Sequence, residues 1–584
     1  MRILGLNTYH ADTSACLVID GIIVSACEEE RFSRIKHFTG FPINSIKYCL
    51  KSSNLNLKDI DFITVNYNFN YNFNERVVFL LSNLKNTSLV YKLLSILNKK
   101  NLADLLYENF GEDVKKKIKF VPHHISHISS SYYTSGFQES VGLSIDATGD
   151  FSSLEYSLFK NNKIEVIAKN HYPHSLGIFY QAISQFLGFR KYGDEYKVMA
   201  LAAFGKPNFK KEFDEIVKFY PPYNFELNLD YFIHQKKFFF EGALASEPYF
   251  ENLYSRNIEN LLGKARNHGE DIKERHKDIA STLQYKFEQI ILKIVNNIYL
   301  ENLSDNICLS GGCFFNSVLN GKIYKLNKFK NLSIHANVGD AGGAIGSALY
   351  TEYENYSNNS KNNKFENYFL GPSYSINEIE QSIKKYFNLL TDFEIRKFEN
   401  YSDLNDIVAN ILSKKGVVAW FQGQSEWGPR ALGNRSIIAD AKVPEIKDIL
   451  NKKIKLREQF RPFAASVLEE DIPNYFSVNQ EGDVFPNMNF VLEAKEVTKN
   501  KYPAIVHIDG SSRIQSVNKE NNSKFYNLIS AFKNKYKSPI LLNTSLNIDE
   551  PICQNPDDVL KSFANTKVDC IALESILLIK RTNL

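Results

Sequence analysis

The sequence predicts an α/β protein of two or three domains, and three features of the chain lead to this prediction. Its 584 residues are too many for a single hydrophobic core. Short apolar runs with the pattern of strands end repeatedly in glycine turns. Residues 271–300 carry apolar side chains at helical spacing with charges between them, which predicts a long packing helix.

The bulk composition is that of a globular enzyme, with 43% hydrophobic and 23% charged residues. The net charge of +4 gives no evidence of a nucleic-acid-binding surface, so we expect no nucleic-acid partner. The seven cysteines are scattered and form no C-x-x-C pair, which indicates neither a disulfide framework nor a cysteine zinc site. Neither a signal peptide nor a membrane span is expected, and a cytoplasmic enzyme is therefore predicted.

The N-terminus predicts two strands and a hairpin. Residues 3–6 and 15–19 are apolar, and the polar loop 10–14 separates them. Asp20 and Gly21 form a turn signal, after which residues 22–26 read as the return strand. The loop holds His10. This residue is either a catalytic histidine or a hydrogen-bonded loop histidine without a catalytic role.

A histidine pair and an aspartate suggest a metal site. His123 and His127 are four residues apart, so on a helix both imidazoles lie on one face and can bind one ion. His124 points about a hundred degrees away on such a helix. A predicted strand at 141–145 delivers Asp146 at its end. The alternative, a surface histidine pair beside an ordinary turn, is equally open for the pair alone.

Three glycine loops follow strand-like runs and are candidates for phosphate binding, because glycine lets backbone N–H groups approach a phosphate. They are Thr148–Asp150, expected as a tight turn after Asp146, and the turns at 310–312 and 339–343. A helix is predicted over residues 341–353.

The polar run 355–363 is the clearest linker in the chain. We therefore expect a first domain at residues 1–355, a linker region at 356–395 and a second domain at 396–584. Residues 209–260, rich in Phe, Tyr and Asn, are interpreted as an insertion or lid.

The hairpin and the three glycine loops resemble the nucleotide-binding fold of actin, the sugar kinases and the heat-shock chaperone ATPases, in which two related lobes close on ATP. The histidine pair and the loops at Asp146, Asn316 and Asp340 are similar to the tRNA threonylcarbamoyl transferase branch of that fold. That resemblance implies the metal ligands His123, His127 and Asp340, with Asp146 as a further oxygen. Two imidazoles with carboxylates suit Fe²⁺, the first choice, or Zn²⁺ or Mn²⁺ better than Mg²⁺.

The second domain carries four unusual motifs, at residues 422–440, 457–466, 507–515 and 542–551. The first reads QGQSEWGPRALGNRSIIAD and the last LNTSLNIDEP. Together with the first-domain set they resemble the NodU/TobZ family of O-carbamoyltransferases over nearly the whole chain. The resemblance implies an actin-like, threonylcarbamoyl-transferase-like domain followed by a YrdC-like α/β domain.

The resemblance also implies a function: an ATP-dependent carbamoyltransferase that makes carbamoyl-adenylate from carbamoyl phosphate and Mg-ATP and transfers the carbamoyl group to a small-molecule hydroxyl. His10 is then the general base. The nucleotide-binding residues implied are Thr148, Gly149, Asp150, Gly311, Gly312, Asn316, Gly339 and Gly342. The carbamoyl phosphate ligands implied are Arg430, Lys455, Arg461, Arg513 and Asn543, since arginine forks bind phosphate well.

Some assignments stay open. Arg435 and Arg457 fit either anion binding or a structural role, and Glu426 and Trp427 fit a role in orienting the Arg430 loop. A tRNA-modifying transferase and a non-enzymatic actin-like ATP-binding regulator are the alternative functions. A homo-oligomer is left open. The acceptor is expected to be sugar-like, with its specificity in residues 209–260, although aromatic residues there also fit simple packing.

Overall fold

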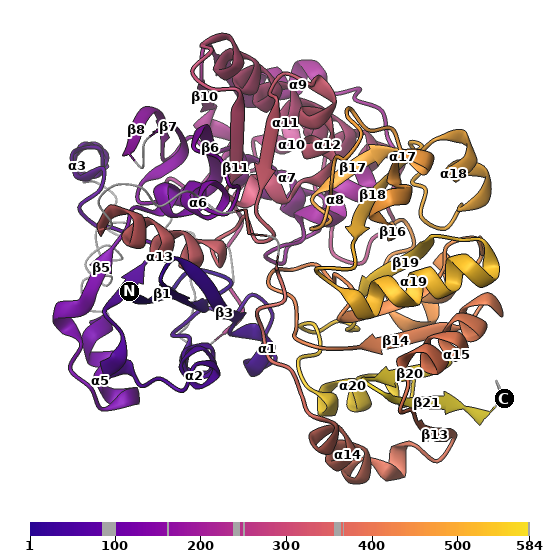
Figure 1. The fold of residues 1–584 in the computed structure, drawn as a ribbon. Coiled ribbons are helices and arrows are strands. Elements are labelled where there is room, and N and C mark those ends of the chain that lie inside the picture. Colours follow the sequence, from indigo (N-terminus) through magenta and orange to yellow (C-terminus); the bar gives the residue numbers. More distant parts are fainter. Residues whose placement is uncertain are drawn as a thin grey trace. The chain divides into compact units, whose positions relative to one another are not determined.

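The computed structural model describes residues 1–83, 101–160, 163–236, 246–248, 251–355, 364–365 and 367–581. These residues divide into two units (Figure 1). Unit 1 is Met1–Leu319 with Leu326–Phe365, and unit 2 is Asn320–Lys325 with Glu366–Leu584. The expected linker at 355–363 lies, except for its first residue, outside the described residues.

The first sheet of unit 1 has five strands in the order β3-β2-β1-β4-β5. The pairs β1–β2 and β2–β3 are antiparallel, whereas β1–β4 and β4–β5 are parallel. The predicted N-terminal strands and hairpin are therefore present. The strands are β1 Arg2–Asn7, β2 Ser14–Ile19, β3 Ile22–Glu28, β4 Phe62–Val65 and β5 Ile118–Phe120.

The second sheet of unit 1 repeats this topology, with the order β8-β7-β6-β11-β12. The central strand is β6. On one side the pairs β6–β7 and β7–β8 are antiparallel, and on the other side β6–β11 and β11–β12 are parallel. Two such sheets in one unit are the duplicated arrangement of actin-like proteins, which confirms the α/β class and the actin-like fold predicted for the first domain. The strands are β6 Glu139–Gly149, β7 Ser152–Lys160, β8 Lys163–His171, β11 Asn306–Ser310 and β12 Asn331–Ile334.

Two helices lie between these sheets. Helix α13 (Gly342–Asn355) packs on β1, β2 and β4, helix α6 (His123–Tyr132) packs on β6 and β11, and the two helices pack against each other. Their approach is close, because a Cβ added at Gly346 of α13 would lie 1.7 Å from the carbonyl oxygen of Ser126 in α6. A larger residue at 346 would therefore separate the layers that carry the site.

Helix α11 (Glu274–Leu300) is the long helix predicted from periodicity, and its apolar face is buried against α7, α8 and α9. Among the described residues, no helix is both long and apolar enough to span a membrane. The other helices and strands of unit 1 are α1 Glu30–Ser33, α2 Ile43–Ser52, α3 Phe73–Ser82, α5 Leu102–Phe110, α7 Leu176–Phe186, α8 Glu195–Ala202, α9 Lys210–Ile216, β9 Val217–Tyr220, β10 Asn224–Leu227 and α10 Ile258–Leu262. Helix α12, Ser317–Leu326, has residues in both units.

Unit 2 is built on one mixed sheet of nine strands in the order β13-β21-β20-β14-β15-β19-β16-β18-β17. Helices α15 and α19 pack together and cover an apolar core that includes the buried Trp420. The strands are β13 Phe393–Lys397, β14 Val417–Phe421, β15 Arg435–Asp440, β16 Ala464–Leu468, β17 Phe490–Glu493, β18 Ser511–Val517, β19 Ile540–Ser545, β20 Cys570–Leu573 and β21 Ile576–Lys580. The helices are α14 Ile376–Lys385, α15 Tyr401–Ser413, α16 Ile446–Asp448, α17 Ile472–Tyr475, α18 Glu496–Lys501, α19 Ser523–Tyr536 and α20 Pro556–Phe563.

Part of the range 356–395, interpreted from the sequence as a linker region, has regular structure. Helix α14 begins at a capping box in which Ser375 and Glu378 bind each other's backbone N–H groups. Strand β13 then pairs with β21 at the edge of the sheet. These residues belong to unit 2 because their apolar side chains, such as Ile379 and Phe393, are buried.

Candidate functional site

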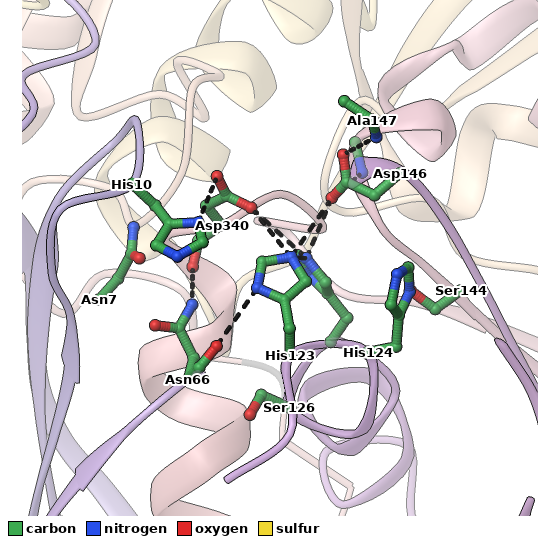
Figure 2. A network of polar contacts seen from close by, with 12 residues as sticks. Asn7, His10, Asn66, His123, His124, Ser126, Ser144, Asp146, Ala147 and Asp340 are labelled. Carbon is green, nitrogen blue, oxygen red and sulfur yellow. Dashed lines mark hydrogen bonds and ion pairs between the residues drawn. The ribbon is translucent and has the colours of Figure 1, made fainter. Parts of the chain in front are cut away.

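Four side chains of metal-ligand type converge in unit 1 (Figure 2). His123 and His127 come from α6, Asp146 from β6 and Asp340 from the turn before α13. One ligand atom of each lies within 4.8 Å of the others. The Nε2 atoms of the two histidines are 2.9 Å apart, and His127 Nε2 lies 3.0 Å from Asp146 Oδ2 and 3.5 Å from Asp340 Oδ1. The structure thus brings together all four residues assigned to the metal.

The donor set fits a divalent transition metal. Ligand bonds of about 2.0–2.2 Å place neighbouring ligand atoms about 3.0–3.5 Å apart, the range of most of these separations. Nδ1 of His123 lies 3.2 Å from the carbonyl oxygen of Asn66, which only accepts, so Nδ1 donates a proton there and Nε2 is the nitrogen that can bind a metal. Two imidazoles and two carboxylates favour Fe²⁺, Mn²⁺ or Zn²⁺ over Mg²⁺.

The cluster is electrostatically prepared for a cation. Burial by itself raises the pKa of the Asp146 carboxyl, but the two imidazoles outweigh it and hold that pKa well below its usual range. Burial likewise lowers the pKa of His127, yet Asp146 and Asp340 raise it to about 9. The two carboxylates therefore attract positive charge to the point where the imidazole nitrogens meet.

His124 faces away from the cluster, as its helical position predicts. Its Nδ1 lies 2.8 Å from the hydroxyl of Ser144 and its Nε2 lies 3.1 Å from the carbonyl oxygen of Ser152. Burial is the main cause that lowers its pKa to about 3, so the ring stays neutral. His124 anchors α6 to β6 and the start of β7.

His10 lies beside the cluster on the loop between β1 and β2 (Figure 2). Its Nδ1 is 3.8 Å from Asp340 Oδ2, and its ring stacks on that of His123 with centroids 5.2 Å apart. The flanking residues Tyr9 and Asp12 have φ of 62° and 56°, the left-handed region that non-glycine residues seldom occupy. The fold therefore holds this loop in a costly conformation that presents His10 to the cluster.

The first glycine loop differs from the expected phosphate turn. Strand β6 continues to Gly149, and the turn lies at Asp150 and Phe151, which both have positive φ. The Asp150 carboxylate accepts the backbone N–H groups of His123 and Asn68 at 2.8 Å, and it pairs with Arg76 at 3.3 Å. It therefore holds the start of α6, and its part in nucleotide binding stays a prediction.

The other two glycine loops adjoin the cluster. The N–H of Gly312 donates to Asp146 Oδ2 at 3.1 Å, and Gly339 and Gly342 flank Asp340 and the start of α13. Gly311, at φ +88°, leads from β11 into this turn. Asn316 pairs with Gln284 of α11 through two hydrogen bonds of 2.9 and 3.1 Å, so its amide is engaged within the protein.

Unit 2 holds a cluster of arginines, made of Arg430, Arg457, Arg461 and Arg513. Burial, reinforced by the charges of the other three, lowers the pKa of the Arg513 guanidinium well below its usual range. Nε of Arg513 is buried and has no hydrogen-bond partner in the described part of the chain. Four neighbouring guanidinium groups repel one another, and an anion such as a phosphate relieves that repulsion.

Lys455 and Asn543 are engaged within unit 2 instead of lying open to an anion. Lys455 follows a π-helix, Ile449–Ile454, and its Nζ donates to Ser545 and to Asn547, with the shortest contacts at 2.6 Å. Asn543 donates to the carbonyl oxygen of Ala431 at 3.2 Å and to the Ser466 hydroxyl at 2.9 Å. Both residues therefore support the loops around the arginines in this conformation.

The loop of Arg430 rests on a buried polar frame. Glu426 accepts three backbone N–H groups of residues 432–435 at 2.8–2.9 Å, which gives it the orienting role. Gln515, for which the sequence suggested no role, donates to the carbonyl oxygen of Leu432 at 2.7 Å. The sequence feature that could have indicated this role is a polar residue, Gln515, on a buried strand, β18. Arg435 is fully buried, donates to backbone carbonyls and stacks on Phe421 at 3.7 Å, so its role is structural.

The aromatic residues of the 209–260 segment pack the interior of unit 1. Phe225 and Phe232 are fully buried and Tyr223 is 6% exposed. Phe238, Phe239 and Phe240 lie outside the described residues. The side chains of Tyr223, Phe225 and Phe232 are therefore not available to stack on an acceptor, whereas Tyr220 of the same segment is 44% exposed.

Known proteins with similar sequences agree with this arrangement of two units. The family model described as Carbamoyltransferase N-terminus matches residues 2–349, and the one described as Carbamoyltransferase C-terminus matches residues 409–580. The chain belongs to the carbamoyltransferase family. It is 34% identical to an uncharacterized protein of Synechocystis, over 99% of this chain and 97% of that one.

Another relative is nodulation protein NolNO of Sinorhizobium fredii, 33% identical over 99% of this chain and 80% of the relative. Among solved structures, component A of (R)-2-hydroxyglutaryl-CoA dehydratase from Acidaminococcus fermentans is 11% identical, with a TM-score of 0.33 over 61% of this chain and 99% of that one.

Proposed function

We propose that this carbamoyltransferase uses carbamoyl phosphate and Mg-ATP to carbamoylate a hydroxyl of a small, sugar-like molecule. The observation that supports this most is the coexistence of two sites suited to phosphate groups, one through a bound metal ion and one through arginines. The metal-type cluster with His10 lies in unit 1, and the half-buried arginine cluster lies in unit 2. Two sites suit two half-reactions, activation of the carbamoyl group and its transfer.

Activation is assigned to unit 2, as a YrdC-like domain. Arg430, Arg461 and Arg513 bind the phosphate of carbamoyl phosphate, and Lys455 and Asn543 hold the loops that position them. Water attacks the carbonyl carbon of carbamoyl phosphate, the C–O bond to the phosphate breaks, and inorganic phosphate and carbamate are released. The carbamate oxygen attacks the α-phosphorus of ATP, and the bond to the β-phosphate breaks, which gives carbamoyl-adenylate and pyrophosphate.

Transfer is assigned to unit 1. His123, His127, Asp146 and Asp340 hold a divalent metal, which supplies Lewis-acid stabilisation of phosphate charge when bound. Backbone N–H groups of the 311–312 and 339–342 turns bind the nucleotide phosphates. His10 accepts the proton of the acceptor hydroxyl, whose oxygen attacks the carbamoyl carbon, and AMP leaves.

The test separates the two half-reactions. Arg461→Ala should abolish carbamoyl-phosphate-dependent release of pyrophosphate from ATP, because an anion ligand of unit 2 is lost. His10→Ala should keep that release and fail in transfer. Arg396→Ala, which removes an exposed arginine of β13, is the matched control and should behave as wild type.

Two results would contradict the proposal. Pyrophosphate release without carbamoyl phosphate would favour a different ATP reaction, and equal loss of release in both variants would remove the division between the units. Carbamoyl-dependent modification of tRNA in place of small hydroxyl compounds would favour the tRNA-modifying alternative.

A further inference from the structure

We propose that Tyr67, Phe69 and Phe120 form an acceptor-binding surface, called here the aromatic platform, on which one face of a sugar ring stacks. This inference rests on the proposed carbamoyl transfer and adds the place where the acceptor binds. It differs from the expectation that the aromatic residues of the 209–260 segment bind the acceptor, which stays a separate prediction.

The platform lies where two parallel strands of the first sheet end. Tyr67 and Phe69 follow β4, and Phe120 is the last residue of β5, which pairs with β4. The ring of Tyr67 lies 5.0 Å from that of Phe69 and 5.5 Å from that of Phe120. Ligands of open α/β sheets bind outside the carboxyl ends of parallel strands, so this edge is a suitable place for a substrate.

The platform is open to solvent. Phe69 is 56% exposed and Phe120 is 45% exposed, and they adjoin each other through Tyr67. Exposing a phenyl ring costs hydrophobic free energy, and neighbouring exposed rings commonly mark a binding surface. The buried aromatic residues of the 209–260 segment, by contrast, contribute to the core.

The platform is continuous with the proposed reaction centre. The ring of His10 stacks on that of Tyr67 with centroids 6.2 Å apart and an angle of 20° between the planes. The same His10 ring stacks on the metal-ligand candidate His123 at 5.2 Å. His10 therefore lies between His123 of the cluster and Tyr67 of the platform. This position suits a general base, because a general base must lie between the activated group and the acceptor.

The order of cluster, His10 and platform favours the acceptor, and not the adenine of ATP, as the group that binds to the platform. The turns assigned to the nucleotide phosphates adjoin Asp146 and Asp340, and Gly312 donates its N–H to Asp146. The platform adjoins His10. A ring stacked on the platform therefore directs a hydroxyl toward His10, which is the geometry that proton transfer requires.

The chemistry of the platform selects an uncharged saturated ring. Aromatic faces carry partial negative charge and attract the C–H groups on one face of a sugar, while the hydroxyls at its edge remain hydrated. Asn70 follows Phe69 in the chain and is exposed, and its backbone N–H donates to Oδ1 of Asn68 at 3.0 Å. We therefore expect a pyranose ring, bound through its axial C–H groups.

The experiment uses the full-length protein with methyl β-D-glucopyranoside as the probe and sorbitol as its open-chain counterpart. Saturation-transfer NMR should show the strongest saturation on the axial protons of one glucoside face and weak saturation of sorbitol. Phe69→Ser and Phe120→Ser should each reduce the glucoside signal and raise its KM in carbamoyl transfer about fivefold or more. Tyr107→Ser removes another exposed aromatic ring of unit 1 and should match wild type.

The outcomes distinguish the two proposals. Wild-type protein that releases no carbamoyl-phosphate-dependent pyrophosphate contradicts the proposed function. Wild-type protein that releases it but does not bind the glucoside, or binds it as well after Phe69→Ser and Phe120→Ser, overturns the platform. A rise in the KM for ATP in these variants, with the glucoside KM unchanged, assigns the platform to adenine and also overturns the inference.

Discussion

Gly149 gives the sharpest test of the metal-type cluster, because a single methyl group there collides with one of its ligands. A Cβ built on Gly149 would lie 1.9 Å from Cδ2, 2.2 Å from Cγ and 2.5 Å from Nε2 of His123. Ordinary contact begins at 3.4 Å, so the Gly149→Ala variant requires the ring to move by about 1.5 Å, the difference between 3.4 and 1.9 Å. His123 is buried, and its Nδ1 is held by the carbonyl oxygen of Asn66.

A shift of that size exceeds what a metal–nitrogen bond of about 2.0–2.1 Å tolerates, so the Nε2 ligand is lost. We expect the apparent Kd for Mn²⁺, measured by isothermal titration of metal-free protein, to rise about 100-fold. The free energy of unfolding in urea should fall by about 1–3 kcal/mol because of the overpacking.

Gly269→Ala is the control variant, because it should lower stability without moving the His123 ring. Gly269 lies in unit 1 at φ +85° with no atom within 4 Å of an added Cβ, so alanine there strains the backbone alone. Its Mn²⁺ affinity should equal that of wild type. Wild-type Mn²⁺ affinity in Gly149→Ala would refute the assignment of His123 as a ligand.

Three further predictions concern residues around the sites. Glu426→Gln should lower the free energy of unfolding in urea by about 1–2 kcal/mol, since a charged acceptor of three backbone N–H groups becomes neutral, and an unchanged value would contradict its orienting role. His124→Phe should cost about 2–3 kcal/mol of stability by leaving two buried groups unsatisfied, yet keep the metal content measured by mass spectrometry; lost metal in a folded variant would make His124 part of the site. Burial alone lowers the pKa of His37, but Asp12, whose Oδ1 is 2.8 Å from its Nδ1, outweighs burial and raises that pKa to about 9. Because the folded-state pKa of His37 is above its ordinary value, the pair stabilises the protein fully below about pH 6.5 and loses this contribution as pH rises through 9. The free energy of unfolding of wild type should therefore exceed that of His37→Asn by about 1–2 kcal/mol at pH 6, and the difference should vanish by pH 9.5. A difference that grows with pH would refute this sign.

Local patterns in the sequence predicted the local structure well. Apolar runs bounded by turn residues gave the β1–β3 strands, and the spacing of apolar side chains gave α11. The four-residue spacing of His123 and His127 predicted one helical face, and α6 places both imidazoles in one cluster with Asp146 and Asp340. These features depend on residues close together in the chain, where periodicity is informative.

Features that depend on distant parts of the chain were not predictable. The repeated sheet topology of unit 1 has no counterpart in sequence similarity, because hydrogen-bonded pairing can be the same with different side chains. Gly149 resembled a phosphate turn, but nothing in its neighbourhood in sequence reveals that His123 covers it. Aromatic density pointed to residues 209–260, whereas exposure points to Phe69 and Phe120, which are 51 positions apart.

The repeated topology also relates the proposed roles to each other. Strand β1 of the first sheet corresponds to β6 of the second, and β4 corresponds to β11. The loop after β1 carries His10 and the equivalent strand carries Asp146, while the loop after β4 carries Tyr67 and Phe69 of the platform and the equivalent loop carries Gly311 and Gly312. Under the proposed function, loops of the first sheet contact the acceptor, and the equivalent loop of the second sheet contacts the nucleotide. A change of acceptor then requires substitutions only near β4 and β5, and the 311–312 turn of the second sheet keeps its nucleotide contacts.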